Sequence, residues 1–132
     1  MTGLAVLEWD AVIVACAVSA GIHAALAPEH VAEGLGAGLG FSMAAGLLAV
    51  LAVALTRSTH AWALFSTVAV LTGLLASYAL AITSGLPLLH PEPEPVTGLA
   101  LFTKAVEAAG LLAATHLLKP AFLLTSPKGI AT

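Results

Sequence analysis

Four long apolar runs constrain the fold of this chain more than any other feature. They cover residues 10–27, 35–56, 61–83 and 98–118. Each is close to the ~20 residues that a helix needs to cross a ~30 Å hydrocarbon layer. Hydrophobic residues make up 60% of the chain and charged residues only 8%, which is more apolar than soluble domains usually are. We therefore predict a single all-α domain over residues 1–132, an integral membrane four-helix bundle.

Polar and proline-rich segments separate these runs. Pro28 disfavours helical geometry in the residue before it, so we expect the first helix to end there. Residues 56–60 are wholly polar, and four prolines fall within residues 87–95. Glu8 and Asp10 lie in an N-terminal stretch without Lys or Arg, unlike the positive start of a secretory signal peptide. We therefore expect the first helix to be retained.

The distribution of positive residues predicts an orientation. Four spans place both termini on one side of the membrane. Arg57, Lys119 and Lys128 would lie on that side, whereas the two loops on the opposite side contain no Lys or Arg. Because cytoplasmic segments carry the excess of positive residues, we expect both termini in the cytoplasm and the chain in a bacterial cytoplasmic membrane. The two opposite loops would then face outward.

Three stretches of the sequence resemble a pattern in small four-span membrane proteins of high-GC bacteria. They read "GIHAALAPEHVAEG", "GFSMAAG" and "TSGLPLLHPEPEPVTGLALFTKAVEAAGL". In that pattern a His-x(4)-Pro-x-His-x(2)-Glu segment follows the first span, and a proline-rich segment precedes a last span with a glutamate. The resemblance extends over most of the chain. It implies the four-span topology and the bacterial source, and no particular activity.

Histidine and glutamate residues gather at the predicted outer end. His23, His30 and Glu33 belong to the end of the first run and its loop, His90 belongs to the second outer loop, and Glu107 lies halfway along the last run. Neutral imidazole nitrogens and carboxylate oxygens together bind Zn²⁺, Cu²⁺ or Fe²⁺. The sequence therefore predicts an outward-facing site for a divalent transition metal. A b-type haem is disfavoured, since the remaining histidines lie at loop or helix ends.

Each of these residues also has a structural interpretation. Glu107 in the middle of a membrane span has to be paired, protonated or facing water, and Lys104 three residues earlier is placed to pair with it. That ion pair would fix helix packing, whereas the functional alternatives are a metal ligand, a proton acceptor or a polar-ligand contact. His23 has the alternative of a hydrogen bond to a neighbouring helix. The segment around His90 reads "HPEPEP", which also suits a stiff polyproline II spacer.

The second run begins with a glycine repeat. Small residues four apart let helices approach closely in membranes, so the repeat predicts helix packing, either within the chain or with another subunit. Its members are Gly34, Gly36, Gly38 and Gly40.

Composition and motifs narrow the function. A net charge of −3 and the lack of a basic patch argue against nucleic acid as a partner, and no Ser-His-Asp or Cys-His arrangement is visible. We expect a non-catalytic accessory or binding subunit that contacts the lipid bilayer. The alternatives are a purely structural subunit or assembly factor of a larger membrane complex, a homo-oligomer, and a quinone- or lipid-binding enzyme subunit in which Glu107 accepts a proton.

Overall fold

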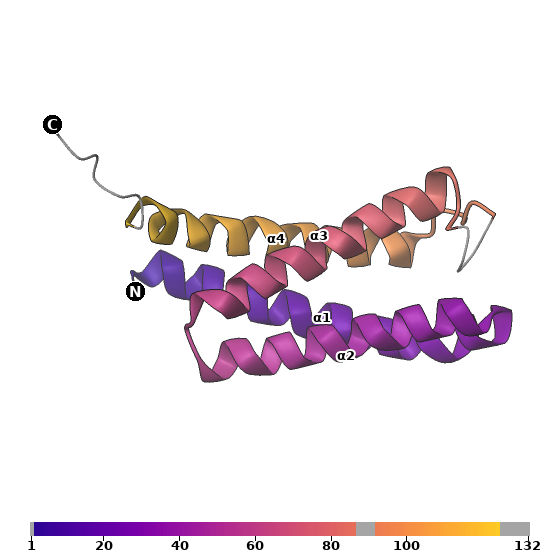
Figure 1. The fold of residues 1–132 in the computed structure, drawn as a ribbon, viewed down its shortest axis with the longest axis horizontal. Coiled ribbons are helices and arrows are strands. Elements are labelled where there is room, and N and C mark those ends of the chain that lie inside the picture. Colours follow the sequence, from indigo (N-terminus) through magenta and orange to yellow (C-terminus); the bar gives the residue numbers. More distant parts are fainter. Residues whose placement is uncertain (1, 87–91, 125–132) are drawn as a thin grey trace, which may run out of the picture.

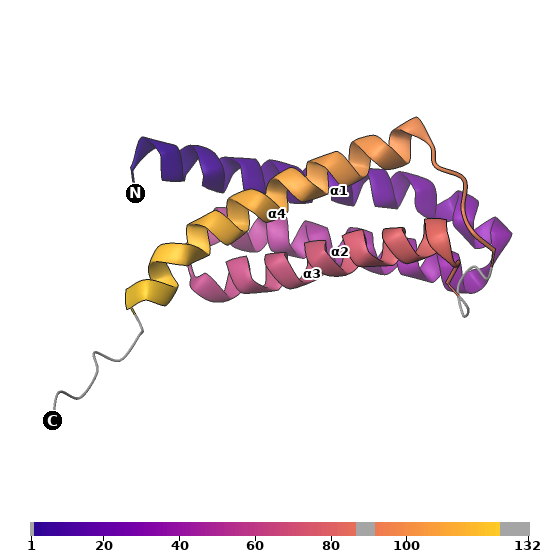
Figure 2. The same ribbon diagram turned by 90° about the horizontal axis from the view of Figure 1, so that it is seen from above.

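The computed structural model describes residues 2–86 and 92–124. This part of the chain forms four helices and no strand, as predicted (Figure 1). All four are long and apolar enough to cross a membrane. The start of α1 and the end of α4 lie at one end of the bundle, and the α1–α2 junction lies at the other (Figures 1 and 2). The helices are α1 (Gly3–Glu33), α2 (Leu35–Arg57), α3 (Ala61–Thr83) and α4 (Gly98–Leu124).

The first helix differs from the predicted one. The side chain of Thr2 caps its N-terminus, and the helix continues through Pro28 to Glu33. The prediction that the first helix ends before Pro28 is therefore wrong. Proline removes one backbone hydrogen bond and crowds the preceding turn, but the last turns of α1 pack against α2, where Val31 meets Gly38. This tertiary contact outweighs the local preference of the proline.

The core lies where α1 meets the other helices. α1 packs along α2 and against α4, whereas α3 packs mainly against α4 and less against α2. Val12, Cys16, Leu48 and Leu71 are buried in this core. A small apolar thiol such as Cys16 fits there as a packing residue. The predicted helix starts at residues 35, 61 and 98 agree with α2, α3 and α4.

Two glycines allow the closest approaches between helices. A Cβ atom on Gly110 of α4 would lie 2.6 Å from Cβ of Ala15 on α1. A Cβ atom on Gly38 of α2 would lie 2.7 Å from Cα of Val31. Gly38 thus packs within the chain, whereas Gly34 is the single residue that links α1 to α2. Gly38 therefore lets α1 and α2 approach closely directly after the turn that joins them.

Candidate functional site

A cavity opens between the four helices near the α1–α2 junction. Its volume is about 550 Å³, and every helix contributes to its wall. Most of the wall is apolar, and α2 contributes the aromatic side chain of Phe41 to it. Glu29, Glu33 and Glu94 lie toward its outer end, where α1 ends and the segment before α4 passes. The cavity is therefore apolar along its length and acidic at its outer end.

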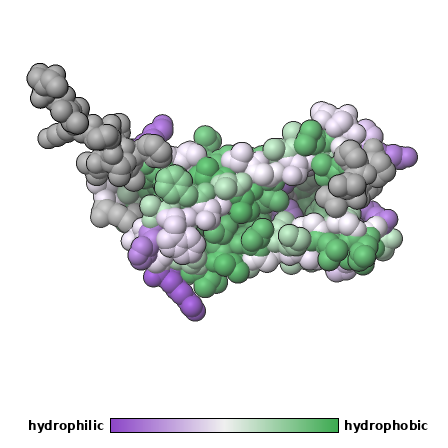
Figure 3. All heavy atoms as spheres, viewed as in Figure 1, coloured by the Kyte–Doolittle hydropathy of each residue, from purple (hydrophilic) through white to green (hydrophobic). Residues whose placement is uncertain are grey.

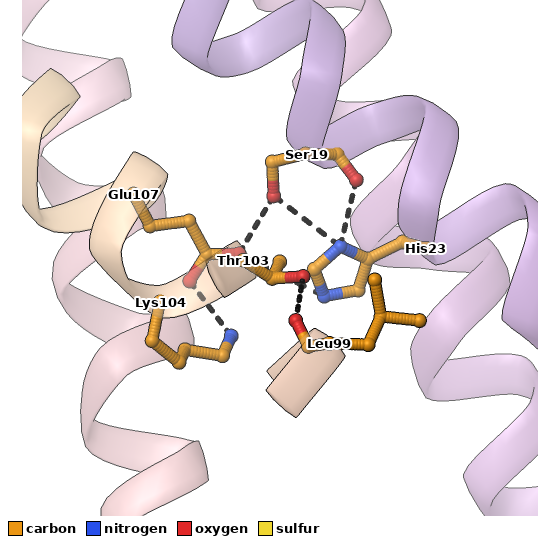
Figure 4. Close-up of polar contacts among 6 residues, drawn as sticks. All are labelled: Ser19, His23, Leu99, Thr103, Lys104 and Glu107. Carbon is orange, nitrogen blue, oxygen red and sulfur yellow. Dashed lines mark hydrogen bonds and ion pairs between the residues drawn. The ribbon is translucent and has the colours of Figure 1, made fainter. Parts of the chain in front are cut away.

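A buried polar network (Figure 4) adjoins the inner end of this cavity, and His23 and Lys104 of this network line the cavity wall. Glu107 of α4 has a fully buried side chain. Nζ of Lys104 lies 2.7 Å from its Oε2, and the hydroxyl of Ser19 on α1 donates a 2.6 Å hydrogen bond to its Oε1. Nε2 of His23 lies 3.9 Å from the same Oε1. The carboxylate is thus surrounded by an ammonium, a hydroxyl and an imidazole.

Helix periodicity places these side chains together. Ser19 and His23 are four residues apart on α1, and Lys104 and Glu107 are three apart on α4, so each pair shares one face of its helix. The contact between α1 and α4 then joins the two faces. A buried charge is costly unless it is paired and hydrogen-bonded, and this junction supplies both kinds of partner to Glu107.

Hydrogen bonding sets the tautomer of His23. Its Nδ1 lies 2.9 Å from the backbone oxygen of Ser19. A carbonyl oxygen only accepts, so we assign the ring proton to Nδ1. In the neutral ring Nε2 then carries a lone pair. His23 also lines the cavity, and it therefore offers an acceptor at its inner end.

The structure brings some of the predicted metal ligands together and separates others. His23 and Glu107 are neighbours, but His30 is about two turns farther along α1. The ring of Phe41 lies near both histidines, with its centroid 3.8 Å from that of His30 and 5.4 Å from that of His23. Glu33 is exposed at the last residue of α1. His90 lies outside the described residues.

No metal-binding cluster is formed in the described part of the chain. Within residues 2–86 and 92–124, no group of three or more His, Cys, Asp or Glu side chains is placed to hold an ion. The predicted metal site therefore stays a prediction. At the opposite end of the bundle, His116 Nδ1 lies 2.8 Å from Glu8 Oε1, and His60 occupies the N-cap position of α3 without a capping bond from its side chain.

Sequence reasoning did not identify Tyr78 as a site residue. It lines the cavity from α3, and its ring centroid lies 5.5 Å from Nζ of Lys104. Its hydroxyl oxygen is buried and has no hydrogen-bond partner among the described residues. Tyr78 is the only tyrosine of the chain, which could have drawn attention to it. The sequence does not indicate its contact with Lys104, because the two residues are far apart along the chain.

Comparison with models of protein families, with curated proteins and with solved structures gives no match.

Proposed function

We propose that the chain is an integral protein of the bacterial cytoplasmic membrane that binds a small lipid-soluble molecule between its helices. Both termini lie in the cytoplasm, as the positions of Arg57, Lys119 and Lys128 favour. The cavity therefore opens near the outer side of the membrane. The role is one of binding, either by the chain alone or as a subunit of a larger complex.

The observation that carries this proposal is the cavity with a buried ionic network at its inner end. Its volume of about 550 Å³ falls within the ~300–1,000 Å³ of typical ligand sites, which combine an apolar wall with a few polar groups. Charged residues inside membrane spans are costly, and they commonly mark a functional site. Here Lys104 both pairs with Glu107 and lines the cavity.

The network supports binding more than catalysis. Lys104 and Ser19 both direct their polar atoms at Glu107, so each oxygen of the carboxylate already has one donor within the chain. The groups that remain available to a ligand are the rest of the Lys104 ammonium, Nε2 of His23 and the Tyr78 hydroxyl.

A neutral fluorescent probe tests the binding proposal. N-phenyl-1-naphthylamine would be titrated into the full-length protein in lipid nanodiscs. Ala44 is buried and lines the cavity, so Ala44→Phe should fill part of it. Leu47→Phe is the matched control, because Leu47 is half exposed on the outer face of α2.

We expect saturable probe fluorescence in the wild type and in Leu47→Phe, and its loss in Ala44→Phe. Equal fluorescence in all three proteins, with thermal midpoints showing that each is folded, would contradict a binding cavity.

A transition metal is the second candidate ligand. His30, Glu29, Glu33 and Glu94 line the outer end of the same cavity, where they lie closer to water than Glu107 does. Elemental analysis of the purified protein, beside a variant with both His30→Ala and Glu33→Ala, tests this candidate. Less than one equivalent of metal per chain after reconstitution would remove it.

A further inference from the structure

The most informative unexplained group in the cavity is the hydroxyl of Tyr78. Its oxygen is buried and lacks a partner among the described residues, and buried hydroxyl groups in folded proteins nearly always have one. Tyr78 lies beside Lys104, which has donor capacity beyond its bond to Glu107. Nζ of Lys104 lies 5.5 Å from the centroid of the Tyr78 ring, so a phenol from α3 and an ammonium from α4 are neighbours in the wall of the cavity.

The charges around the cavity disfavour a charged head group. The positive charge of Lys104 is already matched by Glu107 at 2.7 Å. An anion at this place would stand beside that carboxylate, and it would first pass Glu29, Glu33 and Glu94 at the outer end. A cation would meet the ammonium of Lys104. The inner end therefore suits a neutral head group whose oxygen atoms accept hydrogen bonds.

The rest of the wall suits an apolar, ring-shaped body. Phe41 on α2 and Tyr78 on α3 supply aromatic surfaces, and aliphatic residues such as Leu26 and Leu74 fill the space between the polar ends. Aromatic rings pack well against flat ring systems. The ligand class that combines a neutral flat ring, accepting oxygens and lipid solubility is the quinones.

The arrangement of α2 and α3 provides a route from the bilayer. The two helices diverge toward the α1–α2 junction (Figure 1), and the surface between them is hollowed and shows hydrophilic atoms at its floor (Figure 3). Leu39 and Met43 on α2 and Leu80 on α3 are exposed and apolar. In a membrane they would contact acyl chains, so a molecule dissolved in the bilayer reaches this opening directly.

We propose that the cavity binds a lipid-soluble quinone, one carbonyl oxygen of which accepts hydrogen bonds from the Tyr78 hydroxyl and the Lys104 ammonium. This inference rests on the proposed binding function and adds the class of ligand and the two groups that recognise it. No electron transfer is part of it. The apolar tail of the quinone would leave the cavity between α2 and α3.

Displacement of the neutral probe by a decyl-substituted benzoquinone tests the inference. The full-length protein in nanodiscs would be loaded with N-phenyl-1-naphthylamine and titrated with the quinone, and separately with dodecyl phosphate as an anionic competitor. Tyr78→Phe removes the hydroxyl and keeps the ring. Thr83→Val on the same helix is the control, since the Thr83 hydroxyl bonds to its own helix outside the cavity.

We expect the quinone to displace the probe, and Tyr78→Phe to weaken this displacement about tenfold, as the loss of one hydrogen bond predicts. Thr83→Val should behave as the wild type. Three results would overturn the quinone assignment and leave the binding function standing. The quinone could fail to displace the probe, it could displace the probe equally well in Tyr78→Phe, or it could displace the probe less well than dodecyl phosphate does. If no probe binds in the cavity at all, both proposals fall.

Discussion

At the scale of single residues, Glu107 is the side chain on which the site depends. It is fully buried, and its two carboxylate oxygens are held by Lys104 from its own helix and by Ser19 from α1. Removal of one member of a buried ion pair leaves the other charged and unpaired, which is more damaging than replacement of both members by apolar residues.

Glu107→Gln should therefore lower the free energy of unfolding by about 3 kcal/mol. Lys104→Met combined with Glu107→Leu should lower it less, because neither charge then stays unpaired. Glu8→Gln is the control: Glu8 pairs with the half-exposed His116, and exposed pairs contribute at most about 1 kcal/mol. Unfolding in mixed detergent, followed by circular dichroism, measures all three. A Glu107→Gln loss no larger than that of Glu8→Gln would show that the network does not stabilise the fold.

The site could be predicted from the sequence only where its residues share a helix. The Lys104–Glu107 contact follows from a spacing of three on one helix face. The approach of Ser19 to Glu107 and of Tyr78 to Lys104 depends on how α1, α3 and α4 pack, which no local pattern records. The sequence places His30 about two turns beyond His23 on α1, but it does not show that the ring of Phe41 on α2 lies near both histidines.

At the scale of helices, the hydropathy pattern predicts the first residues of α2, α3 and α4 correctly. The end of α1 that we expected at Pro28 is wrong. Runs of apolar residues report where a backbone has to form its own hydrogen bonds, so α2, α3 and α4 could be placed from composition. α1 instead continues to Glu33, and Val31 in its last turn lies against Gly38 of α2. The helix-breaking effect of proline is a local property of the residue before it, so it does not take account of a contact with the next helix.

Close packing of α1 and α4 at Gly110 gives a prediction at this scale. Gly110→Ala would place a methyl group 2.6 Å from Cβ of Ala15, and overpacking of this kind destabilises by about 1–3 kcal/mol. Ala15→Gly added to Gly110→Ala should recover part of the loss. At Gly73 an added Cβ meets nothing within 4 Å, so Gly73→Ala should cause no loss. Thermal unfolding of these proteins, and of Ala15→Gly alone, measures these effects. Non-additive recovery would identify the contact, and its absence would argue against the close approach.

At the scale of the whole molecule, the orientation across the membrane can be read from two introduced cysteines. Cys16 is buried, so it should stay unlabelled. Thr59→Cys lies in the link between α2 and α3, and Glu33→Cys lies at the opposite end of the bundle. A membrane-impermeant maleimide added to intact cells should label Glu33→Cys alone, and both after permeabilisation. Labelling of Thr59→Cys in intact cells would reverse the proposed orientation.

The length of α1 ties the cavity to the thickness of the membrane around it. Its 31 residues extend for about 46 Å at ~1.5 Å per residue, well beyond a ~30 Å hydrocarbon layer. In a bilayer of that thickness, Glu29 and Glu33 would stand at the level of the lipid head groups if the bundle were upright. A thicker bilayer would draw acyl chains up toward these carboxylates and favour an upright bundle, whereas a thinner one would raise the cavity toward water and favour a larger tilt. Hydrophobic mismatch would then act on the depth of the cavity in the membrane, and through it on which membrane-dissolved molecules meet its opening.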